Sequence, residues 1–234
     1  MSRIIGMSRN IKLEWLNKVA DLYIMGKIES EIKEELNEYL SFEIKSPTNL
    51  KRTRGILMNI WTRDRSDMMQ SKEVAIKLYK TDEREKQLLA HWCLILLAYP
   101  VFADICSTIG KIDRKMFDIN IKEIRDKMFD LWGERSTLFY SIEKNVQTLK
   151  DIGVLHSLPK YQYGINKYSI DDKCGLVLIS STLLALRGKL YLSLEELNNS
   201  PEFFPFDYNI NTNILGESDM FYIDRFDGEL VVGK

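Results

Sequence analysis

The first two-thirds of the chain places apolar residues three and four positions apart, a spacing that predicts amphipathic helices. Ile11, Trp15, Val19 and Leu22 follow this spacing, and Gly26 is a suitable residue to end the helix. The same pattern predicts helices over residues 29–40, 72–79, 88–99 and 120–132, one that begins at Pro47, and one from Pro100 to about Gly110. The chain therefore begins as a series of helices that each bury one face.

After Gly153 the pattern changes to short runs of residues that favour strands. Residues 154–158 and 163–170 predict the two strands of a hairpin, joined by a turn at residues 159–160. An apolar helix over residues 174–188 follows. The last fifteen or so residues predict a second hairpin that turns at residues 227–228, where Asp precedes Gly.

Residues 121–170 predict a recognisable order: helix, turn at Gly133, second helix with Ser136 as its N-cap, then strand, turn and strand. That order indicates a winged helix-turn-helix. The expected fold class is mainly α, a helical bundle with a winged helix-turn-helix element and a small β-hairpin wing. We expect two domains, a helical domain over residues 1–115 with a basic helix, and a winged-helix domain over residues 116–234 with a C-terminal helix and an acidic tail.

The second helix of this element predicts a polar outer face. If Ile142, Val146 and Leu149 point inward, the residues left outward or flanking are Thr137, Tyr140, Ser141, Lys144, Asn145 and Thr148. The major groove of B-DNA admits a helix and presents donors and acceptors to such side chains. Winged helices also dock proteins, so the same face is open to a second interpretation.

Charge along the chain decides where an acidic partner such as DNA could bind. The formal net charge is -1, so attraction to nucleic acid must come from local patches. Residues 135–167 hold five basic side chains against two acidic ones, a local charge of +3, with Arg135 and Lys144 on the helix and Lys160 in the wing.

A second basic segment covers residues 45–65, with six basic side chains against one acidic side chain, a local charge of +5. Ser46 is the expected N-cap and Pro47 the first helical residue. The free N–H groups and the dipole at such a helix start favour a phosphate. The two segments together give the expected DNA-binding residues: Lys45, Ser46, Thr48, Lys51, Arg52, Arg54, Arg135, Ser136, Thr137, Tyr140, Lys144 and Lys160.

The C-terminal tail has the opposite charge. Residues 195–234 hold nine acidic side chains against Arg225 and Lys234, a local charge of -7. We expect this tail to avoid DNA, and three alternatives stay open: it docks a basic partner, folds against the basic helices, or forms a solvated edge. Its aromatic residues predict burial in the core, namely Phe203, Phe204, Phe206, Phe221 and Tyr222.

Motifs of catalysis are missing from the sequence. There is no phosphate-binding loop, dinucleotide fingerprint, nucleophile elbow or metal-ligand spacing. His91 lies in an apolar helix and is expected to be a core histidine, and the three cysteines are expected to be reduced. The most apolar run is too short to cross a bilayer. We therefore expect a cytoplasmic protein, not an enzyme, with no cofactor, no metal and no membrane contact.

Three motifs, in order along the chain, resemble the BrxA family of BREX phage-defence systems. They are "KSPTNLKRTRGIL", "QLLAHWCLILLAYPVFADI" and "LWGERSTLFYSIEKNVQTLKDIGVL", and the resemblance covers about residues 26–155. It implies a largely helical fold with winged-helix-like elements, binding of double-stranded DNA, and other defence-system proteins as partners. It implies no enzymatic activity. The rival hypothesis is a scaffold whose winged helix and acidic tail dock other subunits without DNA contact.

Overall fold

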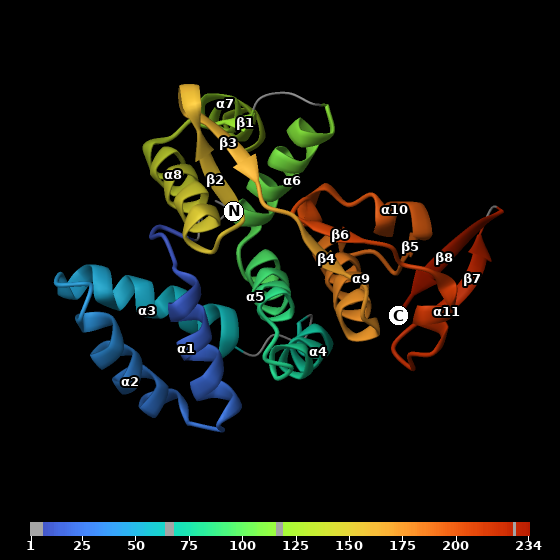
Figure 1. Cartoon of the computed structure of the whole chain (residues 1–234), viewed down its shortest axis with the longest axis horizontal. Coiled ribbons are helices and arrows are strands. Elements are labelled where there is room, and N and C mark those ends of the chain that lie inside the picture. The colour runs from blue at the N-terminus through green and yellow to red at the C-terminus, as the bar shows by residue number, and fades with distance from the viewer. Residues whose placement is uncertain (1–6, 64–67, 116–118, 227) are drawn as a thin grey trace.

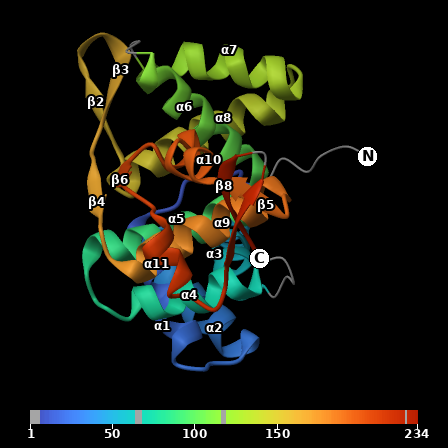
Figure 2. The ribbon, with the colours of Figure 1, turned by 90° about the vertical axis from the view of Figure 1, so that its right-hand side faces the viewer.

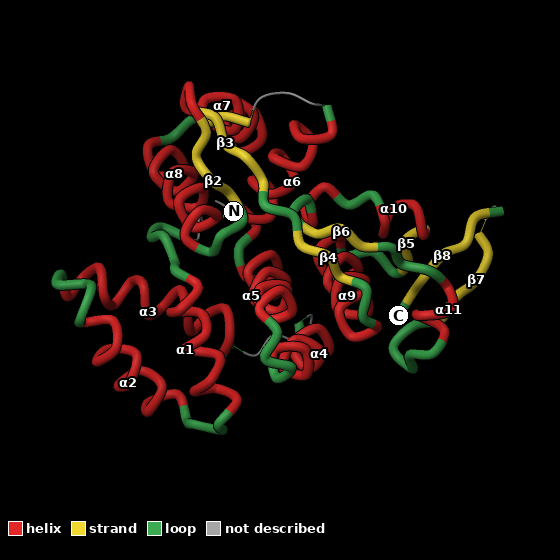
Figure 3. Tube along the Cα trace, viewed as in Figure 1, coloured by secondary structure: helices red, strands yellow, loops and turns green. Residues whose placement is uncertain are grey.

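The computed structural model describes residues 7–63, 68–115, 119–226 and 228–234, and it confirms a mainly helical chain (Figure 3). The helices are α1 (Leu13–Ile24), α2 (Glu29–Ser41), α3 (Pro47–Trp61), α4 (Met69–Tyr79), α5 (Arg84–Ala98), α6 (Pro100–Arg114), α7 (Ile121–Trp132), α8 (Ser136–Asp151), α9 (Lys173–Arg187), α10 (Leu194–Asn198) and α11 (Thr212–Gly216). In both ribbon views α7 and α8 lie at one end of the molecule and α1 and α2 at the other (Figures 1 and 2).

Capping residues set the ends of the helices that matter most for the site. The Ser46 side chain accepts a hydrogen bond from the backbone N–H of Asn49 and Pro47 opens α3, as expected. Helix α7 ends at Gly133, whose φ of +78° favours glycine. The prediction for Ser136 is wrong, because α8 begins one residue earlier. Arg135 is the N-cap, with an extended backbone and no side-chain cap, and Ser136 is the first helical residue.

Helix α5 forms the centre of the core. Every side chain from Leu88 to Ala98 is buried, and α3, α4, α6 and α9 pack around the helix. His91 is fully buried there, accepting at Nδ1 from Trp61 Nε1 (3.0 Å) and pairing at Nε2 with Asn17 Oδ1 (2.8 Å). Burial lowers the pKa of His91 to about 3, so the ring is neutral, and the expected core histidine is confirmed.

A small antiparallel sheet lies against α7 and α8. Its strands are β1 (Ile119–Asn120), β2 (Leu155–Leu158) and β3 (Gln162–Ile165), in the order β1-β3-β2. Both α7 and α8 connect β1 to β2 along the chain. A short 3₁₀ turn, η1 (Pro159–Tyr161), joins β2 to β3 at the expected place.

The second predicted strand of this hairpin, residues 163–170, is two strands and not one. It breaks after β3, and β4 (Tyr168–Ile170) pairs in parallel with β6 (Phe206–Tyr208) in another sheet. Lys167 lies at the break, where its ammonium donates to the Phe204 carbonyl (2.8 Å) and pairs with Asp113 (3.2 Å). These contacts with distant segments direct the chain out of the first sheet, and a local pattern cannot reveal them.

The C-terminal part forms a third sheet, with β5 (Tyr191–Ser193), β8 (Glu229–Gly233) and β7 (Tyr222–Phe226) in that order. The expected final hairpin is confirmed as β7–β8, although Asp227 of its turn lies outside the described residues. Phe203 of η2 (Pro201–Phe203), Phe204 and Phe206 are buried as predicted. Phe221 is only half-buried, and the prediction for Tyr222 is wrong: 49% of it is exposed, and its ring lies across Gly233.

One continuous cluster of buried side chains extends from Met7 to Val232. It includes residues on both sides of residue 115, so the division into two domains stays a prediction. Within the described ranges no single helix combines the length and apolar character needed to cross a membrane. The pair α5–α6 meets both conditions together, but its two helices bend by 116° at Pro100.

Candidate nucleic-acid interface

Helix α8 has an apolar inner face and a polar outer face. Ile142, Val146 and Leu149 are buried, as the spacing predicts, and Leu138 is buried as well. The outward residues form one stripe along the helix, since positions three and four apart share a face. Ser136, Thr137 and Tyr140 are exposed and Lys144 is half-buried on this side.

Three side chains expected to lie outward or on the flank of the helix are in fact buried: Ser141, Asn145 and Thr148 are at most 1% exposed. The segment of residues 7–12, here called the N-terminal strap, covers them. Ser141 Oγ donates to the Met7 carbonyl (2.9 Å), as does Asn145 Nδ2 at 3.4 Å, and Thr148 Oγ1 accepts from the backbone N–H of Ile11 (3.0 Å). These residues therefore fix the strap to α8 and are not available to a ligand.

The N-terminal strap also connects α8 to the basic helix α3. Asn49 Oδ1, in the first turn of α3, accepts from Arg9 at both Nη2 (2.7 Å) and Nε (3.1 Å). Asn10 Nδ2 donates to Asp151 at the end of α8 (2.8 Å). Arg9, Asn49 and Lys144 line one cavity of about 270 Å³. The two basic segments, far apart in sequence, are thus neighbours in space.

Arg9 and Asn10 were missed by sequence reasoning. The signal was small: three polar residues, "SRN" at residues 8–10, precede the first helix. Their position beside α8 depends on the strap, which bridges residues more than 130 positions apart.

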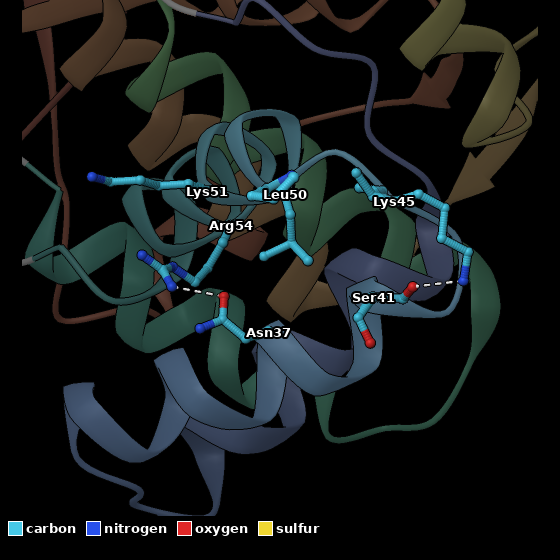
Figure 4. A pocket seen from close by; sticks show the side chains of 8 residues that line it. Asn37, Ser41, Lys45, Leu50, Lys51 and Arg54 are labelled. Atoms are coloured by element: carbon cyan, nitrogen blue, oxygen red, sulfur yellow. Dashed lines mark hydrogen bonds between the residues drawn. The ribbon is translucent and has the colours of Figure 1, made fainter.

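Helix α3 carries basic side chains that are exposed or half-buried. Thr48, Lys51 and Arg52 are exposed. On one flank a hollow of about 480 Å³ separates α3 from α2 (Figure 4). Arg54 Nη1 donates to Asn37 Oδ1 there (2.7 Å), and Lys45 Nζ donates to the Ser41 carbonyl (3.1 Å). These neutral partners orient the cations without cancelling their charge.

The expected DNA-binding cations share one property. Among the described residues, no carboxylate forms an ion pair with Lys45, Lys51, Arg52, Arg54, Arg135, Lys144 or Lys160. By contrast, Lys167 pairs with Asp113, although it contributed to the local charge of the wing segment. Arg65 and Asp64 lie outside the described residues.

The turn between β2 and β3 projects an exposed aromatic ring beside a cation. Tyr161 is 90% exposed and Lys160 is exposed as well. Both have positive φ values, 59° and 60°, which cost free energy in residues other than glycine. In Figure 1, α3, α8 and this turn follow one another up the left-hand part of the molecule. The elements that carry the candidate cations therefore lie along one side.

Acidic side chains are scarce on this face of α8. Glu143 is exposed there, and its carboxylate pairs with Arg125 of α7 (3.3 Å).

Two cysteines lie in the core, away from this face. Burial raises the pKa of the Cys93 thiol to about 12, and the pKa of the Cys106 thiol is also raised, so both thiols stay protonated near neutral pH. No three His, Cys, Asp or Glu side chains of the described chain gather as ligands for a metal ion. The exposed surface of α3, α8 and the β2–β3 turn, which carries cations that no described carboxylate pairs with, is therefore suited to binding an anion and not a metal ion.

The chain matches no protein-family model, no curated protein sequence and no solved structure. The ligand of the surface formed by α3, α8 and the β2–β3 turn is therefore inferred from the geometry and charge of that surface.

Proposed function

We propose that this protein binds double-stranded DNA without catalysing a reaction, through α3, α8 and the β2–β3 turn. The observation that carries the proposal is the set of cations without ion pairs on three elements, α3, α8 and the β2–β3 turn, that lie along one side of the molecule (Figure 1). Exposed cations that lack carboxylate partners repel one another, and phosphates of a duplex would relieve that repulsion. The net charge of -1 restricts this attraction to the face itself.

The topology supports a winged helix as the DNA-binding element. Helix α6 is followed by β1, α7, α8, β2 and β3, and the sheet order is β1-β3-β2. In a helix-turn-helix arrangement the second helix enters the major groove. That helix is α8, with Thr137 and Tyr140 outward, and the β2–β3 turn is the wing. Phosphate contacts from α3 would set the orientation of the duplex.

The test is a titration of a fluorescent duplex by anisotropy at several salt concentrations. If about six phosphates are neutralised, log K falls against log salt with a slope near -5. A single-stranded oligonucleotide of the same sequence is the control for duplex preference. Absence of binding at low salt, or an affinity that salt does not change, would contradict the proposal.

The biological setting that we propose is a BREX-type phage-defence system. Its support is the resemblance of three sequence motifs to the BrxA family. Deletion of the coding sequence in its host should raise the plating efficiency of phages that the system restricts. Restoration by the wild-type chain, but not by a variant that has lost duplex affinity, would link the two proposals.

A second candidate function, docking of another protein, is favoured by a different region. Tyr191, Tyr222 and Phe226 are exposed on the C-terminal sheet, and the rings of Tyr191 and Phe226 lie 5.4 Å apart. Clustered exposed aromatics are typical of protein interfaces. A Tyr222→Ser/Phe226→Ser variant should keep its duplex affinity and lose phage restriction. Unchanged restriction would count against this candidate.

A further inference from the structure

The cavity between α3 and α8 brings together two cations from different parts of the chain. Arg9 comes from the N-terminal strap and Lys144 from the outer face of α8, and both line a cavity of about 270 Å³. Asn10, Asn49 and Thr53 contribute amides and a hydroxyl, and Trp15 and Ile44 provide an apolar floor. No acidic side chain lines the cavity, so its charge is positive.

Arg9 is held in place while part of its guanidinium stays available. Nε and Nη2 each donate to Asn49 Oδ1, and Nη1 donates to the Ser8 carbonyl (2.6 Å). A guanidinium has five N–H groups, so one N–H remains on each terminal nitrogen. Asn49 and Ser8 are neutral partners, and the positive charge is not cancelled. A side chain fixed in this way loses little conformational entropy when it binds an anion.

Lys144 supplies a second charge without a fixed partner. Its ammonium forms no ion pair with any carboxylate that the structure describes. Residue 144 is one helical turn beyond Tyr140, so the cavity continues the outward stripe of α8. An anion in this cavity would therefore be in line with a duplex lying against α8.

We propose that this cavity binds one phosphodiester of the DNA backbone, with Arg9 and Lys144 on its oxygens. The inference rests on the proposed duplex binding and adds a residue, Arg9, that lies outside both basic segments. The charged oxygens meet the two cations, while the deoxyribose lies against Trp15 and Ile44. The strap is thus part of the interface and not only a connection between helices.

Two cations on one phosphate give a measurable signature. Each phosphate that is neutralised contributes about 0.9 to the slope of log K against log salt. If Arg9 and Lys144 share one phosphate, the Arg9→Gln/Lys144→Gln double variant loses about 0.9 in total. Lys51 and Arg52 point outward from α3, so the Lys51→Gln/Arg52→Gln variant loses about twice as much if they meet separate phosphates.

The experiment measures duplex affinity of the full chain by anisotropy at five salt concentrations, for wild type, Arg9→Gln, Lys144→Gln and the double variant. Lys80→Gln, an exposed cation beyond α4, is the matched control and should leave the slope unchanged. Circular dichroism checks folding, and Lys144→Gln keeps the test valid if Arg9→Gln loosens the strap. Unchanged slopes, or an additive loss near 1.8, would overturn the shared phosphate site. Absence of duplex binding by wild type would instead overturn the proposed function itself.

A free phosphate ion is the alternative ligand for this cavity, because it presents the same charged oxygens as a phosphodiester. A second arm compares the melting temperature in sodium phosphate and in sodium chloride of equal ionic strength. If phosphate protects wild type more than Lys144→Gln while the duplex slopes are unchanged, the cavity takes free phosphate and the backbone assignment is wrong. If both the slope and the phosphate protection depend on Lys144, the assignment holds.

Discussion

The exposed surface of α3 and α8, here called the α3–α8 face, differs from the C-terminal region, from α9 to the C-terminus, where three of the five cations form ion pairs with described carboxylates. On the face, Lys51, Arg52 and Lys144 form no ion pair with a described carboxylate. In the C-terminal region, Lys173 pairs with Glu217 (3.0 Å), Lys189 with Glu196 (2.7 Å), and Arg187 with Glu202 (3.5 Å). A paired surface cation is already neutralised. The α3–α8 face thus presents cations that no described carboxylate neutralises, and the proposed duplex binding would use them.

Their exposed aromatic residues differ as well. Tyr140 and Tyr161 stand on separate elements of the basic side, each beside cations. Tyr191 and Phe226 contact each other on the C-terminal sheet, within an acidic surrounding. Among the described rings, that of Tyr140 contacts only its neighbour Phe139 (5.6 Å), whereas Tyr191 and Phe226 join two strands into one exposed apolar surface of the kind that suits a protein partner.

Charge reversal should separate the two regions most strongly. At about 0.1 M salt each phosphate contact contributes roughly tenfold to affinity, and a reversed charge adds repulsion. Lys51→Glu/Arg52→Glu and Arg135→Glu/Lys144→Glu should therefore each lower duplex affinity by roughly a hundred- to a thousandfold, measured by anisotropy. Glu195→Lys/Asp224→Lys, in the acidic tail, is the matched reversal and should cause no loss. If the first two variants bind as wild type, DNA contact at these sites is ruled out.

Acid should destabilise the packing of α5 against α3 and α1, because His91 of α5 forms hydrogen bonds with Trp61 of α3 and Asn17 of α1. Burial lowers the pKa of His91 from 6.5 to about 3, so the unfolded chain binds this proton first. The free energy of unfolding should then fall as pH falls through 6.5, by roughly 1.4 kcal/mol per unit down to about pH 3.

Urea unfolding from pH 7 to pH 4 measures this dependence. His91→Gln keeps both hydrogen-bonding roles without the titration, and should show a shallower dependence on pH than wild type. His156→Gln, at an exposed histidine of β2, should behave as wild type. Equal slopes for wild type and His91→Gln would show that His91 does not control the effect.

The inner and outer polar residues of α8 should respond differently to substitution. Asn145→Ala removes a buried amide that donates to the Met7 and Ser141 carbonyls, and should lower the free energy of unfolding by about 1–3 kcal/mol. Thr137→Ala, on the outer face, should leave stability within about 0.5 kcal/mol of wild type. Thermal and urea unfolding measure both. A neutral Asn145→Ala would show that this buried amide contributes little to stability.

The smallest expected effect concerns sequence preference. Thr137→Ala and Tyr140→Ala should change affinity only a few-fold, and by different amounts for different duplexes, if α8 reads bases. Lys51→Gln should weaken all duplexes alike, since phosphate contacts carry no sequence information. Competition among a small set of duplexes provides the measurement. A uniform loss in the α8 variants would restrict that helix to backbone contacts.

Local signals in the sequence were enough to locate most helices and the two hairpins. Ser46 caps its own helix through its side chain, and Pro47 and Gly133 act through their backbone conformation, so these local effects can be predicted. The outer face of α8 was predicted in part. Tyr140 and Thr137 are exposed, but Ser141, Asn145 and Thr148 are covered by residues 134 to 138 positions away along the chain. Periodicity indicates which face of a helix is polar. It cannot indicate whether that face contacts solvent or a polar segment from elsewhere in the chain.

The N-terminal strap also has a consequence for synthesis of the chain. Met7 leaves the ribosome long before Ser141, its partner 134 positions later. At a synthesis rate of roughly 5–20 residues per second, Ser141 is made roughly 7 to 27 seconds after Met7. During that interval α1 and α3 can fold, but Arg9 has no Lys144 beside it. The complete cavity, with both of its cations, therefore forms late in translation.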